Sequence, residues 1–236
     1  CALPICAYAF APYIDDERNG GNSIHSMVLG GQATFNPGGT NIIPSITYTV
    51  PDDPTEQVDL IAGYSGIIDG DYGMQDGSTG IVPVTFHHVL SAVQFKVEFT
   101  RPIQVEALTL SGVYKKGTGY IDDQGNQVVT PIKDVNENNT EDEMDGDLYS
   151  HTFTFNGSGS GYTEFPLSDG KAGGTLTSGE QTLMMVPQTL PETAYVTLTY
   201  KDSDNGGASW NDTKTLSCPL QGNLWKPRSE EHTSEL

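Results

Sequence analysis

The residues best suited to bind a metal ion form a long acidic run, "IKDVNENNTEDEMDGD" (132–147). Its candidate calcium ligands are carboxylates and amides at partly alternating positions: Asp134, Asn136, Asn138, Asp142 and Asp145. Calcium loops space their oxygen ligands in this way. The match is incomplete, because Asn139 stands where glycine is required, Asp145 stands where glutamate is required, and no flanking helices are evident. We therefore predict a solvated loop, with calcium binding as the alternative.

Histidine and cysteine are not arranged to bind a metal. His87 and His88 are adjacent, so in a strand they point to opposite faces and cannot readily share an ion. No cysteine or acid lies nearby at ligand spacing. The three cysteines, Cys1, Cys6 and Cys218, are odd in number and lack a CxxC pair. This pattern predicts neither a metal site nor a disulfide framework, and a Cys6–Cys218 bridge is the alternative.

The sequence carries no recognisable catalytic signature. It contains no Gly-x-Ser-x-Gly, no phosphate-binding loop and no His-Glu-x-x-His. A glycosidase needs two carboxylates across a cleft, and the acids here cluster in turns and long loops instead. We predict that the protein is not an enzyme, with no catalytic residue, no metal and no cofactor. Trp210 and Tyr72 lie in expected loops, where an aromatic ring can stack on a sugar but more often clamps a turn.

The composition excludes several classes of partner. The chain has 31 acidic residues against 11 basic ones, giving a formal net charge of −20 at pH 7. Such a chain repels nucleic acids and anionic lipid surfaces, so we expect no nucleic-acid partner. No run approaches the roughly 20 apolar residues that span a bilayer. The 27 glycines and 14 prolines favour short strands joined by turns.

The clearest element is "VQFKVEFT" (93–100), whose apolar side chains share one face: Val93, Phe95, Val97 and Phe99. This strict alternation is typical of a half-buried strand. Upstream, "VPVTFHHVLSA" (82–92) begins with the same alternation and then shifts to helical spacing. We predict a strand there, followed by one helical turn.

Further strands are predicted at 45–50, 58–65, 105–114, 151–157, 182–188, 194–200 and 214–220. The first two are separated by "PDDPTEQ" (51–57), a turn whose two prolines bar continued pairing. "TLMMVPQ" (182–188) is continuously apolar, so we expect a central strand covered on both faces. Many short strands with frequent turn signals predict an all-β sandwich.

The chain divides at the Gly/Asp-rich segment "SGIIDGDYGMQDGSTG" (65–80). We place a boundary near residue 80, which gives an N-terminal β-sandwich domain (1–80) and a C-terminal one (81–227). The ending "RSEEHTSEL" (228–236) resembles the in-frame translation of a sequencing-library adapter, so we expect a non-native tail. A native, solvated tail is the alternative. We expect both ends of the chain to be truncated.

Several segments between Val58 and Lys226 resemble, in order, the fimbrillin family of fimbrial subunits and surface lipoproteins of gut and oral anaerobic bacteria. They are "QVDLIAGY", "VPVTFHHVLSAVQFKV", "LTLSGVYKKGTG", "LMMVPQTLPETAYVTLTY" and a final "LW". The marker residues are a Phe-x-His-x-Leu pattern, a Val-Pro-Gln pattern and the last Trp: Phe86, His88, Leu90, Val186, Pro187, Gln188 and Trp225. These residues mark a structural family and carry no catalytic signature.

The resemblance implies two transthyretin-like β-sandwich domains. It implies that His88 packs in the helical turn with its ring hydrogen-bonded to the backbone. In the family, a turn and a Tyr-rich last strand follow the final Trp, whereas here "LWKP" runs into the adapter-like residues. We therefore expect the C-terminal domain to lack its last strand.

The resemblance also implies a cell-surface, outer-membrane lipoprotein that joins other fimbrial subunits by β-strand exchange and supports adhesion. The lipid anchor belongs to a signal that this sequence does not include. Strand exchange works because an unpaired sheet edge offers backbone donors and acceptors to a partner strand. The alternative is a stand-alone surface lipoprotein that binds a host or bacterial glycan or protein through its loops.

Overall fold

The computed structural model describes residues 7–11, 33–36, 45–66, 84–122, 126–131, 148–155, 162–227 and 230–233. Its strands are β1 (Tyr8–Ala11), β2 (Ala33–Asn36), β3 (Ser45–Thr49), β4 (Ile61–Tyr64), β5 (Thr85–His88), β6 (Ser91–Phe99), β7 (Ile103–Tyr114), β8 (Lys116–Ile121), β9 (Gln127–Pro131), β10 (Leu148–Thr154), β11 (Thr163–Phe165), β12 (Ala172–Thr175), β13 (Leu183–Met185), β14 (Gln188–Thr189), β15 (Tyr195–Asp202), β16 (Lys214–Pro219), β17 (Leu224–Trp225) and β18 (Glu230–Thr233). Two short 3-10 turns, η2 (Pro54–Glu56) and η4 (Gly179–Gln181), provide the helical structure within these ranges. None of the described helices is long and apolar enough to cross a membrane.

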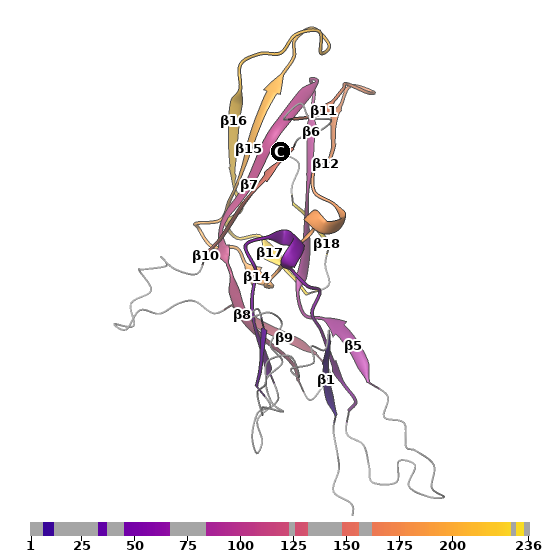
Figure 1. The fold of residues 1–236 in the computed structure, drawn as a ribbon, viewed down its shortest axis with the longest axis vertical. Helices are drawn as coiled ribbons and strands as arrows, with labels where there is room; N and C mark the ends of the chain where they lie inside the picture. The colour runs from indigo at the N-terminus through magenta and orange to yellow at the C-terminus, as the bar shows by residue number, and fades with distance from the viewer. Residues whose placement is uncertain are drawn as a thin grey trace, which may run out of the picture.

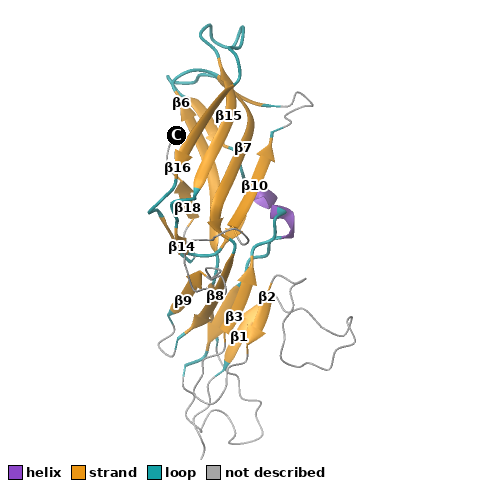
Figure 2. Ribbon diagram, turned by 90° about the vertical axis from the view of Figure 1, so that its left-hand side faces the viewer, coloured by secondary structure: helices purple, strands orange, loops and turns teal. Residues whose placement is uncertain are grey.

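The molecule is elongated, and its strands gather into an upper and a lower lobe (Figures 1 and 2). In the upper lobe, one sheet has the order β10-β7-β15-β16, with β11 also paired to β7. The facing strands β12, β13 and β18 all pair with β6. Aromatic rings pack between these layers. The ring centroids of Phe95 on β6 and Phe153 on β10 are 6.5 Å apart, and those of Phe99 on β6 and Tyr200 on β15 are 4.9 Å apart. The predicted all-β sandwich is confirmed.

The lower lobe combines strands from both halves of the sequence. One sheet has the order β2-β3-β8-β9 and the other the order β1-β4-β5. Strands β5 and β8 come after residue 80, yet they pair with β4 and β3, which come before it, and β9 then pairs with β8. The lobes therefore do not coincide with the expected 1–80 and 81–227 division, because pairing brings distant segments back to the first strands.

Strand β6 has the alternation that its sequence predicts. Val93 and Val97 are fully buried and Phe95 nearly so, whereas Lys96 on the opposite face is exposed. The helical turn expected just before it is wrong. The chain passes from β5 to β6 through Val89 and Leu90 alone, and both are buried in the core. Their apolar spacing reflects burial at a bend between two strands.

The apolar segment 182–188 does not form one central strand. It is split into β13, which pairs with β6, and β14, which pairs with β17. Proline at position 187 cannot donate a ladder hydrogen bond, so the chain changes sheets there. The buried residues of this segment, Leu183 and Met185 to Gln188, lie where sheets meet.

One nearly continuous run of chain joins the lobes. β7 ends in the upper lobe at Tyr114, and after Lys115 the chain continues as β8 in the lower lobe. The 51–57 segment, predicted as a turn, contains η2 and lies at this junction (Figure 1). There Gln57 donates to the Pro51 carbonyl at 3.0 Å and accepts from the Met184 amide at 2.6 Å. This side chain ties the junction to the β13 strand.

The tail segment Glu230–Thr233 forms β18 and pairs in parallel with Ala92–Phe95 of β6. This segment pairs as a strand although its sequence has no apolar alternation. The pairing uses backbone groups, which every residue except proline supplies in the same way. An extended segment can therefore join β6 with little requirement on its side chains.

Candidate functional site

The first candidate site is the edge formed by β16. It is the last strand in the order β10-β7-β15-β16, and within the described residues no strand pairs with its outer side. Its inner side pairs antiparallel with β15 over six residues. An edge of this kind presents a row of backbone donors and acceptors.

Side chains on β16 are exposed on both faces of the sheet. Leu216 is 36% exposed, although its neighbour across the ladder, Leu198, is fully buried. On the opposite face of the sheet, Tyr195 on β15 is also exposed. Between Thr215 and Cys218 the strand carries no charge, and charged residues are the common protection of natural edges. Chemically, this edge is suited to accepting another strand.

The charged residue that begins β16 is held by an ion pair. Lys214 Nζ lies 2.6 Å from Asp202 Oδ2 and 2.7 Å from Asp202 Oδ1. This hydrogen bond, with a second one from Asn211, holds the pKa of Asp202 below its ordinary value, and the same contact raises the pKa of Lys214. The pair fixes the base of the 203–213 loop beside the edge.

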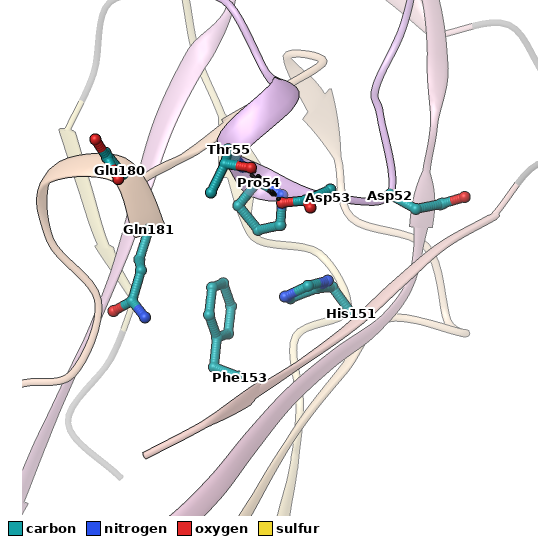
Figure 3. A pocket seen from close by; sticks show the side chains of 8 residues that line it. All are labelled: Asp52, Asp53, Pro54, Thr55, His151, Phe153, Glu180 and Gln181. Atoms are coloured by element: carbon teal, nitrogen blue, oxygen red, sulfur yellow. Dashed lines mark hydrogen bonds between the residues drawn. The ribbon is translucent and has the colours of Figure 1, made fainter. Parts of the chain in front are cut away.

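The second candidate site is a hollow of about 380 Å³ at the junction of the lobes. It is lined from three segments: Asp52, Asp53, Pro54 and Thr55 around η2, His151 and Phe153 on β10, and Glu180 and Gln181 on η4 (Figure 3). The Asp53 carboxylate caps η2 by accepting from the Thr55 amide at 2.9 Å and its hydroxyl at 2.8 Å. These hydrogen bonds lower the pKa of Asp53.

The Phe-x-His-x-Leu residues lie where β5 turns into β6. Phe86 is 43% exposed, and its ring lies beside Gly63, the residue opposite it on β4. Leu90 is buried in the core. His88 Nδ1 lies 2.8 Å from Asp59 Oδ2, a contact that sequence reasoning missed. Because the helical turn is absent, the expected position of His88 in it is wrong.

The Val-Pro-Gln residues and the last Trp gather where β14 meets β17. Val186, Pro187, Gln188 and Trp225 are all buried. Gln188 pairs with Trp225 across the two-stranded ladder. Its side chain reaches β7, accepting from the Tyr114 amide and donating to the Tyr114 carbonyl. These residues support the junction between the lobes.

Several residues singled out in the sequence lie outside the described ranges. They are the calcium candidates Asp134, Asn136, Asn138, Asp142 and Asp145, together with Tyr72, Cys1 and Cys6. Cys218 is a free thiol on β16. Within the described ranges, no group of three or more histidine, cysteine or acidic side chains is placed to hold a metal ion.

The loop of Trp210 is a turn held by its own side chains. Ser203 Oγ accepts from the Gly207 amide at 2.8 Å, and Asn205 Oδ1 accepts from the Ser209 amide at 2.9 Å. The Trp210 ring lies over Gly207. This arrangement agrees with the clamp role, because the ring covers the turn that it follows.

The two candidate sites were missed at the sequence level because they depend on pairing. The hollow joins residues near 53, 152 and 180, and the one available signal was the predicted turn at 51–57. The exposure of Leu216 depends on the absence of a strand beyond β16 among the described residues, which local alternation cannot report.

Comparison with protein-family models and with curated proteins finds no match. Among solved structures, the chain is similar to a crystal structure of a fimbrial protein from Bacteroides vulgatus ATCC 8482. The TM-score is 0.53 at 15% sequence identity, over 92% of this chain and 68% of that one. This chain has the fold of a fimbrial protein. At such an identity the likeness establishes the fold alone, and membership of the fimbrillin family stays a prediction.

Proposed function

We propose that the chain is a structural subunit of a cell-surface fimbrium, which joins other fimbrial subunits by β-strand exchange and supports adhesion to surface glycans or proteins. The same proposal includes export as an outer-membrane lipoprotein, two transthyretin-like domains and no enzymatic activity. The fold shared with a fimbrial protein supports the general role.

The observation that carries the proposal is the open edge of β16. Strand exchange needs backbone groups that a partner can pair with, together with apolar side chains that it can cover. β16 supplies the first along its outer side and the second through Leu216, which is 36% exposed. A partner strand placed there would extend the upper sheet and cover Leu216.

The pairing of β18 with β6 supports the same proposal. A segment of four polar residues, Glu230–Thr233, pairs with Ala92–Phe95 through the backbone. A strand of this fold can therefore accept an extended segment that does not match it in apolar pattern.

The test is assembly in solution, followed by electron microscopy and by hydrogen exchange at β16. We expect concentrated protein, alone or with other fimbrial subunits, to form chains in which the β16 amides that point away from β15 become protected. Leu216→Lys should reduce assembly, because a charge on an edge strand opposes pairing. The matched control is Ala208→Lys, which adds the same charge in the exposed 203–213 loop. Assembly with unprotected β16 amides, or monomers throughout, would contradict the proposal.

A further inference from the structure

The hollow at the junction of the lobes is separate from the β16 edge and involves different elements. It lies between η2, β10 and η4, and Figure 3 shows side chains from all three converging on it. Its volume of about 380 Å³ falls within the range of small ligand sites, roughly 300–1,000 Å³. A hollow this size can hold one side chain of a partner with part of its backbone.

The floor of the hollow is aromatic. The rings of His151 and Phe153 meet edge to face with centroids 4.7 Å apart, and Tyr149 stacks on the other side of His151 at 6.3 Å. Buried Pro54 faces them from η2. This row of rings fixes the shape of the hollow.

The rim of the hollow is acidic. Asp53 lies at the start of η2 and Glu180 lies on η4. Within the described residues, no lysine or arginine forms an ion pair with either carboxylate, and no lysine or arginine lines the hollow. Asp52 is different, because Lys115 Nζ lies 2.8 Å from its Oδ1. The rim therefore offers two carboxylates without a lysine or arginine partner above an aromatic floor.

We propose that this hollow binds a lysine or arginine side chain of a partner protein. The aliphatic stem of such a side chain packs against half-buried His151, and its charged end is attracted by the carboxylates of Asp53 and Glu180. The net charge of −20 attracts a basic partner over longer distances and raises its local concentration.

A sugar fits this hollow less well. Sugar binding by stacking needs a broad, exposed ring face, and Phe153 is only 4% exposed. The uncompensated charge on the rim favours a cation over a neutral polyol. A glycan nevertheless remains an outcome that the experiment distinguishes.

The test is an NMR titration of the whole chain with the peptide acetyl-Gly-Arg-Gly-amide, following the ring signals of His151 and Phe153. Measurements are made at pH 8, above the range in which histidines ordinarily titrate. The matched ligand is the same peptide with citrulline, which has nearly the same shape without the charge. Asp53→Asn keeps an acceptor for the η2 cap, and Glu180→Gln keeps the size of the side chain. Their controls are Asp212→Asn and Glu192→Gln, which remove one charge elsewhere.

We expect the arginine peptide to shift both ring signals and the citrulline peptide to shift neither. Each rim variant should weaken binding about two- to fivefold, as the loss of one exposed ion pair does, and each control should leave it unchanged. Equal binding of the citrulline peptide would overturn the proposal. So would equal weakening by the controls, no shift with the arginine peptide, or a response of these rings to galactose or N-acetylglucosamine instead.

Discussion

Gln188 holds both backbone groups of Tyr114. Its Oε1 accepts from the Tyr114 amide at 2.8 Å, and its Nε2 donates to the Tyr114 carbonyl at 3.0 Å and to the Val186 carbonyl at 2.9 Å. Gln188 is 3% exposed, so water cannot readily replace these bonds. The side chain thus pairs with the backbone of Tyr114 as a neighbouring strand would, at the point where β7 ends and the chain passes toward the lower lobe.

Replacing Gln188 should therefore destabilise the fold. We expect Gln188→Ala to lower the free energy of unfolding by about 2–4 kcal/mol, because it removes three hydrogen bonds from a buried site and leaves backbone groups without these partners. Urea unfolding followed by fluorescence measures this change. Gln221→Ala is the control, since Gln221 is exposed and bonds with exposed Glu192. Equal losses in the two variants would contradict the role given to Gln188.

Gly112 should tolerate no side chain. It has φ of 75°, and an added Cβ would lie 1.7 Å from the Thr193 carbonyl oxygen. We expect Gly112→Ala to lower stability by about 3–5 kcal/mol through collision and backbone strain together. Gly222→Ala is the matched control, because φ there is 81° and nothing lies within 4 Å of the added atom. It should cost about 1–2 kcal/mol in thermal or urea unfolding, and a similar loss at both sites would contradict the collision.

Alkaline pH should destabilise the protein through its buried tyrosines. Burial raises the pKa of Tyr48 to about 12, with the Val58 backbone opposing the shift, and burial likewise raises the pKa of Tyr149. An unfolded tyrosine loses its proton near pH 10, before the folded one does. The stabilisation is thus fully present below pH 10 and is lost as the pH rises toward 12, by up to about 1.4 kcal/mol per pH unit for Tyr48.

Urea unfolding at pH 9, 10 and 11 measures this loss. Tyr48→Phe removes the ionisable group, so its stability should fall less steeply with pH than that of the original chain. The control is Tyr195→Phe, a change at an exposed tyrosine at the start of β15, which should leave the slope unchanged. An unchanged slope in Tyr48→Phe would show that Tyr48 does not contribute.

The Asp202–Lys214 pair should stabilise the protein at neutral pH and not in acid. The folded pKa of Asp202 is lowered by its hydrogen bonds with Lys214 and Asn211. Its stabilisation is therefore present above the unfolded value near 4 and is lost as the pH falls through the lower folded value. We expect Asp202→Asn to be less stable than the original chain at pH 7 and to approach it below pH 4. Asp212→Asn, an exposed carboxylate in the same loop, should show no such convergence.

The sequence predicts local structure well where burial alternates along one strand. The faces of Val93, Phe95 and Lys96 follow directly from a period of two, because β6 has one face in the core. The same reasoning fails at Val89 and Leu90, where consecutive burial in a bend imitates a helical turn. It also fails at Pro187, where an apolar run continues although the chain changes sheets.

Lobe organisation depends on pairings that local patterns do not encode. Strands β8 and β9 pair in the lower-lobe sheet that β2 and β3 begin. Two glycines in β8 allow it to pack closely against Val186 and Val89. An added Cβ at Gly117 would lie 2.4 Å from Val186, and one at Gly119 would lie 2.8 Å from Val89. In the sequence these glycines are typical of a turn. Strand alternation and turn signals predicted the all-β fold, and the family resemblance singled out Gln188 and its neighbours, whereas their position at the junction, the hollow and the place of the open edge required the structure.

The passage of one chain from β7 into β8 also determines how the molecule bears tension. This run extends along the long axis through both lobes (Figures 1 and 2). In the upper lobe it lies between β10 and β15, and antiparallel ladder bonds are perpendicular to the strands. A pull on the two ends of the molecule loads those bonds in shear, so many must break together. If the strands were instead separated from one end, the same number of hydrogen bonds would break one after another, at a much lower force.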